Sequence, residues 1–221
     1  MINPGTDDLG GPLARKTAFA YRCRACSRCC WNKTIQVNPY ELAQLTLALD
    51  CNLETLITYH TVGGNRLRQS TDGRCVFLGE EGCTVHAHRP LVCRLYPLGR
   101  IVNTDRERFV ELQPHPRSAG LYGRDGMVDD YLGSQEAEAY MVAADVYFRL
   151  YLDLAESSQL QNQNVHVHEQ DLSAMLLDLQ GTVVETCADS GAPVPRSLEE
   201  MVPFHGEAIR SRLLNAGHNI P

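Results

Sequence analysis

Cysteine spacing is the feature that most restricts how this chain can fold. Of nine cysteines in 221 residues, seven form two groups: Cys23, Cys26, Cys29 and Cys30, spaced C-x-x-C-x-x-C-C, then Cys75, Cys83 and Cys93. Thiols at two-residue spacing can turn their sulfurs toward one point, as in the bacterial ferredoxin run that binds an iron–sulfur cluster. Zinc sites more often use separated C-x-x-C pairs. The spacing favours iron–sulfur, 4Fe-4S in particular, and leaves zinc open.

The cellular compartment decides between metal ligands and disulfides. No segment approaches the ~18 consecutive apolar residues of a membrane span, and residues 1–11 lack the basic start and apolar centre of a signal peptide. We therefore expect a cytoplasmic protein with no membrane association. Cytosolic thiols are kept reduced, so clustered cysteines there are more often metal ligands or redox groups than a disulfide framework.

Charge is unevenly divided along the chain. Residues 1–100 hold 12 Lys+Arg against 8 Asp+Glu, whereas residues 101–221 hold 8 against 19. Arginines lie within a few residues of most cysteines, where they can offset the negative charge of a thiolate centre. A basic patch for nucleic acid is the competing interpretation, which the overall net charge of −7 and the lack of a nucleic-acid module signature disfavour.

The pattern of elements predicts an α+β fold: a small, mostly helical domain with short strands and hairpins around a cysteine-bound metal centre. Asn38-Pro39 and Asn52 are N-cap signals for helices over about 39–49 and from Leu53. Short strands are expected at 34–37, at 75–78 with 83–85, and in a hairpin over 100–112. A single helical turn should carry Cys93. Residues 113–126 read as a loop, residues 128–157 as one long helix, and a further helix capped by Asp171 should precede a short amphipathic end.

Three segments are expected along the chain. Residues 1–18, with Gly and Pro punctuation and no apolar period, predict a flexible N-terminal segment. Residues 19–157 should form the cysteine-cluster metal-binding domain, and residues 158–221 a helical C-terminal extension packed on it.

The motifs resemble a known family, the YkgJ-like cysteine-cluster proteins with the CxxCxxCC signature, described as a zinc- or iron-chelating domain. The matching stretches are Tyr21-Arg-Cys23-Arg-Ala-Cys26-Ser-Arg-Cys29-Cys30, Cys75-Val-Phe-Leu, Gly82-Cys83-Thr-Val-His86 and Arg89-Pro90-Leu-Val-Cys93-Arg94-Leu-Tyr96-Pro97. The resemblance covers roughly residues 19–155. It implies that the seven cysteines bind metal, and a related region in flagellin lysine N-methylases implies an iron–sulfur enzyme branch.

The chain departs from this pattern at one place. Many relatives have a further cysteine before the Gly-rich loop, where this chain reads His115-Pro-Arg-Ser118-Ala-Gly120. Seven thiolates can fill two tetrahedral sites if one bridges, or His86, His88 or His115 can supply an eighth contact. A single four-iron cluster needs four cysteines and leaves three thiols. Cys30 is a ligand of a second metal, a bridge or a free thiol, because adjacent residues rarely bind one ion together.

Other residues receive secondary assignments. We expect Arg89 and Arg94 to donate hydrogen bonds to the thiolates or the cofactor, with anchoring of their turn as the alternative. Cys51 and Cys187 read as small buried apolar residues. The alternation of His166 and His168 lacks the helical spacing of a hydrolytic zinc site.

Three functional hypotheses follow. The first is a metal-binding protein whose iron–sulfur or zinc centre is structural or carries electrons, with an unidentified protein or redox partner. The second is a metal-dependent group-transfer enzyme related to the flagellin methylases, although no glycine-rich methyl-donor motif and no nucleophile–base pair is readable, so catalytic residues are unknown. The third is metal storage or delivery. The sequence leaves open whether the protein is an enzyme.

Overall fold

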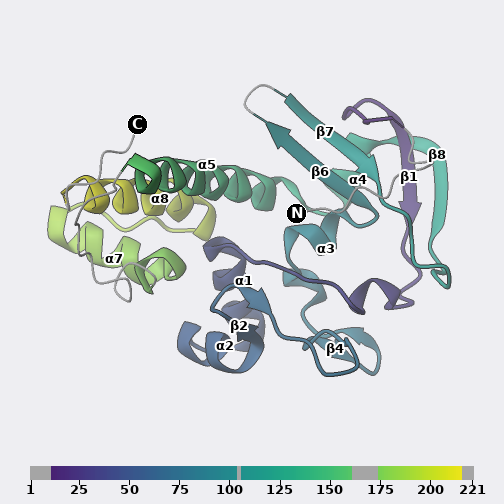
Figure 1. The fold of residues 1–221 in the computed structure, drawn as a ribbon, viewed down its shortest axis with the longest axis horizontal. Coiled ribbons are helices and arrows are strands. Elements are labelled where there is room, and N and C mark those ends of the chain that lie inside the picture. Colours follow the sequence, from purple (N-terminus) through teal and green to yellow (C-terminus); the bar gives the residue numbers. More distant parts are fainter. Residues whose placement is uncertain (1–10, 104–105, 161–173, 216–221) are drawn as a thin grey trace. The chain divides into compact units, whose positions relative to one another are not determined.

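The computed structural model describes residues 11–103, 106–160 and 174–215 (Figure 1). Within them, helices alternate with short antiparallel strands that pair two by two. This confirms the predicted α+β class. None of the described helices combines the length and the apolar character needed to cross a membrane.

The chain forms two compact units, and each unit is assembled from two separate stretches. Unit 1 comprises residues 1–35 and 69–138, and unit 2 comprises residues 36–68 and 139–221. This division differs from the one expected from the sequence. The expected boundary at residue 157 falls inside the continuous helix α5 (Glu138–Leu160), and residues 36–68 group with the C-terminal helices instead of with the cysteines.

Unit 1 is built on two-stranded ribbons. Strand β1 (Ala18–Arg22) pairs with β8 (Leu121–Met127), and β6 (Leu98–Asn103) pairs with β7 (Arg106–Glu111). Between them lie η1 (Arg28–Cys30), β4 (Leu78–Gly79), β5 (Gly82–Cys83), η2 (His86–His88), α3 (Leu91–Leu95) and α4 (Val128–Ser134). The core of this unit is small and includes Phe19, Leu98, Phe109 and Val128, which are almost fully buried.

Ordered contacts in unit 1 begin earlier than the expected position near Phe19. Leu13 exchanges two backbone hydrogen bonds with Phe109. The Arg15 guanidinium forms ion pairs with Glu107, Asp129 and Glu138 at 2.6–3.3 Å. Residues 11–17 show no hydrophobic periodicity. The sequence pattern therefore gave no indication of these long-range partners.

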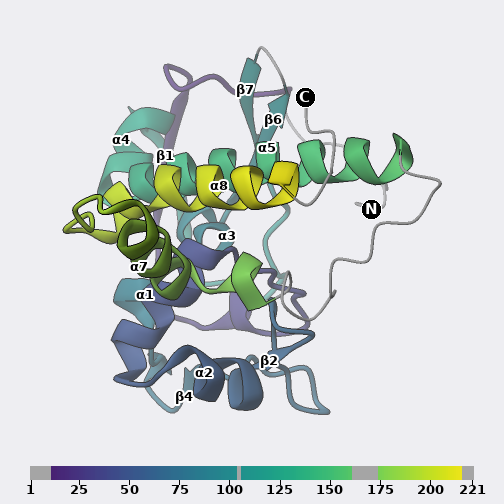
Figure 2. The ribbon, with the colours of Figure 1, turned by 90° about the vertical axis from the view of Figure 1, so that its left-hand side faces the viewer.

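Unit 2 is helical. Helices α1 (Pro39–Leu49) and α2 (Leu53–His60) are followed by the short pair β2 (Thr61–Val62) and β3 (Arg66–Leu67). The rest is most of α5, then α7 (Leu179–Ser190) and α8 (Leu198–Asn215). Figures 1 and 2 show α8 lying along α5, and α1 contacts both α7 and α8. The shared core contains Leu42, Leu45, Met141, Leu179, Ile209 and Leu213.

The predicted helix caps are confirmed. Asn38 accepts a hydrogen bond from the backbone N–H of Glu41, whose carboxylate accepts from the backbone N–H of Asn38, a complete capping box. Asn52 accepts from the backbone N–H of Thr55 at 2.8 Å. The predicted hairpin over 100–112 and the helical turn around Cys93 are also present, as β6–β7 and α3.

Four local predictions were wrong. Residues 121–127 form strand β8 instead of a loop, because the ladder to β1 supplies the partners that a Gly-containing stretch lacks locally. Residues 128–157 form two helices, interrupted where Glu136 adopts a left-handed φ of 51°. Residues 34–37 contribute only an isolated bridge at Gln36, and the C-terminal end is the 18-residue helix α8. Asp171 lies outside the described residues, and the N-cap of α7 is Asp178.

Candidate metal centre

All seven motif cysteines lie in unit 1, and Cys51 and Cys187 lie in unit 2. All nine are free thiols, with no disulfide between them. Cys187 is buried, and its thiol points toward the carbonyl of Pro193 at 3.7 Å. Cys51 is partly exposed next to the N-cap of α2. Cys187 is thus a small buried residue as predicted, whereas Cys51 is not fully buried.

The first cysteine run follows directly from β1 and is tightly coiled. Ala25 and Ser27 adopt left-handed φ values of 51° and 56°, and η1 then carries Cys29 and Cys30. The turn at Ala25 brings its backbone N–H to the sulfur of Cys23, at 3.4 Å. Backbone strain in the αL region is retained where surrounding structure requires it, and ligand-binding loops are a common place.

A short ladder joins this run to the next cysteine. The backbone N–H of Cys75 donates to the carbonyl of Cys30 at 2.9 Å, and the N–H of Asn32 donates to the carbonyl of Gly73 at 2.8 Å. A bridge between Trp31 and Arg74 lies between these two bonds. Backbone pairing therefore fixes Cys30 and Cys75 as neighbours.

The remaining two cysteines come from the β4–β5 hairpin and from α3. Cys83 is the last residue of β5. It follows Gly82, whose φ is 117° and where an added Cβ would lie 3.7 Å from the hydroxyl of Ser27. The hairpin therefore touches the first cysteine run. Cys93 occupies the middle of α3 and donates its N–H to the carbonyl of Pro90.

Four of the seven sulfurs share one arrangement: each accepts a hydrogen bond from the backbone N–H two residues further on. The pairs are Cys23 with Ala25, Cys26 with Arg28, Cys75 with Phe77, and Cys83 with Val85. Such N–H donors favour the charged thiolate over the thiol. They are also the kind of outer contact that orients metal-bound sulfur and tunes its electronics.

The thiols differ in their acidity. The backbone N–H of Ala119 holds the pKa of Cys26 below its ordinary value, with help from the N–H of Arg28. A hydrogen bond with the Cys30 thiol, 3.9 Å away between sulfurs, lowers the pKa of Cys29 to about 7. The same interaction, together with burial, raises the pKa of Cys30. Burial is the main cause of the raised pKa of Cys75 and of Cys83.

These electrostatic effects also show which sulfurs are neighbours. Negative charge on Cys83 and Cys93 contributes to the raised pKa of Cys30, and charge on Cys29 contributes to those of Cys75 and Cys83. Among the described residues, however, no three His, Cys, Asp or Glu side chains lie close enough together to hold a metal ion. Six of the sulfurs therefore each lie within electrostatic range of at least one other, without closing a coordination shell; they are those of Cys26, Cys29, Cys30, Cys75, Cys83 and Cys93. In chemical type, a set of partly buried thiols with N–H donors fits zinc or an iron–sulfur cluster.

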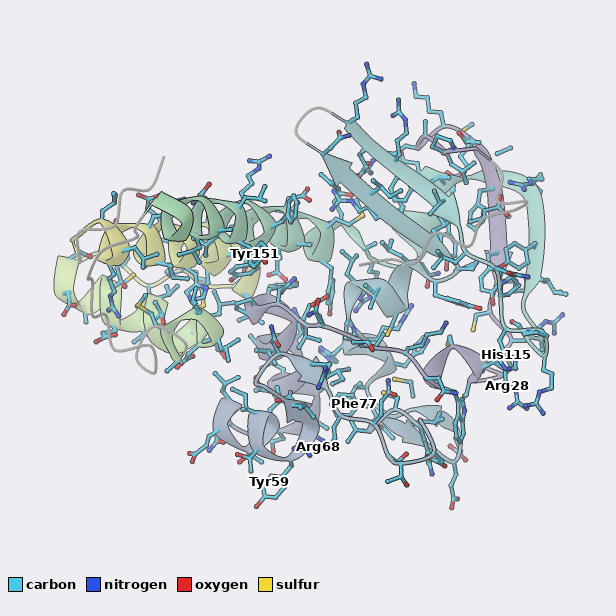
Figure 3. The ribbon with its side chains drawn as sticks, in the orientation of Figure 1. Arg28, Tyr59, Arg68, Phe77, His115 and Tyr151 are labelled. Atoms are coloured by element: carbon cyan, nitrogen blue, oxygen red, sulfur yellow. The ribbon has the colours of Figure 1, made fainter. Side chains whose placement is uncertain are left out.

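The segment that lacks the expected eighth cysteine lies against Cys26. The Ala119 N–H donates to the Cys26 sulfur at 3.5 Å, and the Ser118 hydroxyl interacts with both Cys26 and the Tyr21 phenol. Gly120 is required there, because an added Cβ would lie 2.0 Å from the Tyr21 oxygen. Figure 3 shows His115 near Arg28, at the same end of unit 1.

Two tyrosines near the sulfurs were not singled out from the sequence. Tyr21 and Tyr96 contact each other edge to face at 6.3 Å between ring centroids. Burial raises the pKa of both phenols, and nearby cysteine charge contributes. Tyr21 belongs to the quoted Tyr21-Arg-Cys23 stretch and Tyr96 to Leu-Tyr96-Pro97, so adjacency to the motif was the available signal.

The two predicted arginines are held in different ways. Arg94 is buried, and its guanidinium donates to the carbonyls of Ala87, Arg89 and Gln135. Arg89 donates to the His86 carbonyl at 2.6 Å and to the Gln135 side chain at 2.7 Å. These hydrogen bonds of Arg89 and Arg94 anchor the turn that carries α3. The positive charge of Arg89 also lowers the pKa of Cys29, and a direct bond from either arginine to sulfur remains a prediction.

The predicted histidines are distributed unevenly. His86 and His88 are the first and last residues of the 3-10 turn η2. His115 is exposed, and its Nδ1 accepts from the backbone N–H of Arg117. His166 and His168 lie outside the described residues.

Comparison with known proteins is consistent with the cysteine pattern. Residues 22–115 match the model of the CxxCxxCC family, described as "Putative zinc- or iron-chelating domain". This confirms the resemblance for a stretch that contains all seven motif cysteines and covers less than half of the chain. Searches of curated proteins and of solved structures found no match.

Proposed function

We propose that unit 1 carries an iron–sulfur cluster, bound by four thiolates of the seven-cysteine set, in a structural or electron-transfer role. The observation that carries the proposal is the repeated hydrogen bond from the N–H of residue i+2 to the cysteine sulfur, at four separate cysteines. Structural thiols have no need of a donor aimed at each sulfur. Thiolates that bind metal do, because the bonds stabilise their negative charge.

The ligands divide by position. Cys23, Cys26 and Cys29, at two-residue spacing, would supply three ligands of a 4Fe-4S cluster, and one of Cys75, Cys83 and Cys93 the fourth. Cys30, whose sulfur lies 3.9 Å from that of Cys29, would then remain a free thiol beside the cluster. When bound, such a cluster accepts and gives up single electrons at a potential that hydrogen bonds to sulfur and solvent exposure tune.

The rest of unit 1 has separate tasks in this proposal. The Cys30–Cys75 ladder holds the two cysteine groups together, and Arg94 fixes the turn that carries Cys93. Ser118 and Ala119 would donate hydrogen bonds to the Cys26 sulfur and help to hold it in place. Reduced cysteines of this kind suit the cytoplasm, where we place the protein.

Metal analysis of protein purified without oxygen tests the proposal. We expect brown protein with broad visible absorption, iron and acid-labile sulfide in equal amounts, and little zinc. Colourless protein with about two zinc ions per chain would contradict the cluster and favour two thiolate zinc sites that share a bridging cysteine.

A further inference from the structure

Five cationic side chains border the cysteine run in unit 1. They are Arg22, Arg24, Arg28 and Lys33 from the first run and Arg117 from the segment that contacts Cys26 through Ala119, and we call them the cationic rim. Residues 22–33 and 113–120 contain no Asp or Glu. These two segments therefore bring only positive charge to the sulfurs of Cys23, Cys26 and Cys29, while Glu80 and Glu81 lie in the adjacent β4–β5 turn.

The side chains of the cationic rim are largely accessible to solvent and form no ion pair within the described residues. Arg22, Arg24, Lys33 and Arg117 are exposed, and Arg28 is half-buried. Over the part of the chain that the structure describes, none of the five forms an ion pair, whereas Arg15, Arg100, Arg124, Arg210 and Arg212 all do. No described carboxylate neutralises these five charges by direct contact, so they contribute to the electrostatic field on the solvent side.

An apolar side chain lies beside the rim. Leu121 pairs with Arg22 across the β1–β8 ladder, so the two side chains are on the same face, and Leu121 is 50% exposed. Two of the sulfur-bearing residues, Cys23 and Cys29, are also exposed. A small apolar contact bordered by arginines next to an accessible reactive centre has the composition of a transient protein interface.

We propose that the cationic rim is the docking surface for an acidic one-electron carrier protein. The inference rests on the proposed function and adds the partner. Carboxylates on the carrier would face the rim, steer the encounter and bring its cofactor near Cys23 and Cys29. One electron leaves the reduced carrier, which is oxidised by one, and the cysteine centre is reduced by one, with no bond made or broken.

A nucleic acid is the other polyanion that such a rim could attract. Unit 1 as a whole holds 14 Lys+Arg against 13 Asp+Glu, so it has no extended positive surface that could follow a phosphate backbone. The positive charge is local to the sulfurs. This concentration favours a partner that must approach the metal centre.

A charge-reversal pair provides the test. Arg24→Glu with Arg117→Glu changes two exposed rim residues, and Lys16→Glu with Arg106→Glu is the matched control, with two exposed cations of the same unit away from the cysteine run. The holoprotein is titrated calorimetrically with an oxidised acidic flavodoxin at low and at high salt. Stopped flow then follows the reduction of the holoprotein by the reduced flavodoxin. A zwitterionic viologen radical serves as a second reductant, which needs no docking surface.

We expect the rim variant to bind flavodoxin at least about tenfold more weakly at low salt and to be reduced correspondingly more slowly. The control should stay within about twofold of the parent protein, and all three should react equally with the viologen. Unchanged binding and rate in the rim variant would overturn the inference. Rim-dependent binding of a single-stranded RNA, with flavodoxin ignored, would overturn it in favour of nucleic acid.

Failure of the proposed function would have a different signature. A zinc-containing protein that neither reductant reduces would refute the cluster and the electron transfer. Rim-dependent flavodoxin binding by that protein would still support the acidic-partner surface. A brown, viologen-reducible protein that ignores flavodoxin would refute the docking surface alone.

Discussion

The two units hold their shape by different means. In unit 2, long helices bury a common apolar core in which Leu42, Leu45 and Ile209 have no exposed surface. In unit 1, elements of two to seven residues surround seven free thiols, and much of the order comes from backbone ladders and from buried Arg94. Short elements bury little apolar area. The comparison indicates that unit 2 is stable through its core, and we expect unit 1 to depend on the metal centre proposed for its sulfurs.

Loss of one motif cysteine should have the largest effect and should be confined to unit 1. Cys26→Ser removes a sulfur that accepts two backbone N–H groups. We expect loss of bound metal and, because ligand binding and folding free energy are linked, rapid amide hydrogen exchange throughout residues 11–35 and 69–138. Metal analysis and exchange mass spectrometry measure both.

The matched control is Cys187→Ser in unit 2, whose thiol has only the Pro193 carbonyl as a described partner. It should keep the full metal content. A Cys26→Ser protein with parent-like exchange in unit 1 would show that unit 1 does not rely on its metal, and the contrast between the units would fail.

Truncation in the core of unit 2 should give the converse result. Ile209 in α8 is fully buried, and Ile209→Ala leaves a cavity that costs about 2–5 kcal/mol of unfolding free energy. We expect faster exchange in unit 2 with metal content unchanged. Exposed Val184→Ala in α7 serves as the control and should change stability by less than about 0.5 kcal/mol. Metal loss in the Ile209→Ala protein would mean that the units are not energetically separate.

Acid should weaken unit 2 through one buried histidine. His205 has no exposed surface; its Nδ1 contacts the Tyr147 hydroxyl at 2.9 Å and its Nε2 the Met175 carbonyl at 3.0 Å. Burial lowers its pKa, although the Met175 carbonyl and Asp178 act in the opposite direction. The unfolded chain therefore takes up a proton first, and stability is full above the ordinary pKa near 6.5 and falls as the pH drops below it.

We expect the unfolding free energy to fall as the pH drops from 7.5 to about 5.5, with a slope of at most about 1.4 kcal/mol per pH unit. Chemical denaturation at several pH values measures it. His205→Gln, which can donate and accept but does not titrate, should remove this part of the slope. A slope equal to the parent's would assign the effect to other groups.

The smallest expected effect concerns the cap of α1. Asn38→Ala removes one half of the capping box and should reduce the unfolding free energy by about 1 kcal/mol. Asn38→Ser should restore most of the loss. Equal stability of all three proteins in denaturant titrations would show that the core of unit 2, and not the cap, determines where α1 begins.

Prediction from sequence succeeded where the signal is local. The Asn38 and Asn52 caps and the helical turn at Cys93 all depend on residues within a few positions of one another. It failed at β8 and at Arg15, because their partners lie about 100 residues away in the sequence. The contact between Ser118 and Cys26 likewise joins residues that are distant in the sequence. The motif could mark the position of the missing eighth cysteine, but it could not show that this position lies next to Cys26.

The interleaving of the two units has a consequence for synthesis on the ribosome. All seven motif cysteines have been made by residue 93, so their thiols can meet metal early, although β8 and the segment that contacts Cys26 follow later. Helix α1 must wait longer, because its contacts in α7 and α8 begin about 130 residues downstream. Its apolar side chains are exposed to chaperones and to aggregation during that interval. Because each unit combines two separate stretches, no single cut in the chain releases a complete unit. Helix α1 is synthesised early but completes its contacts only after α7 and α8 have been made.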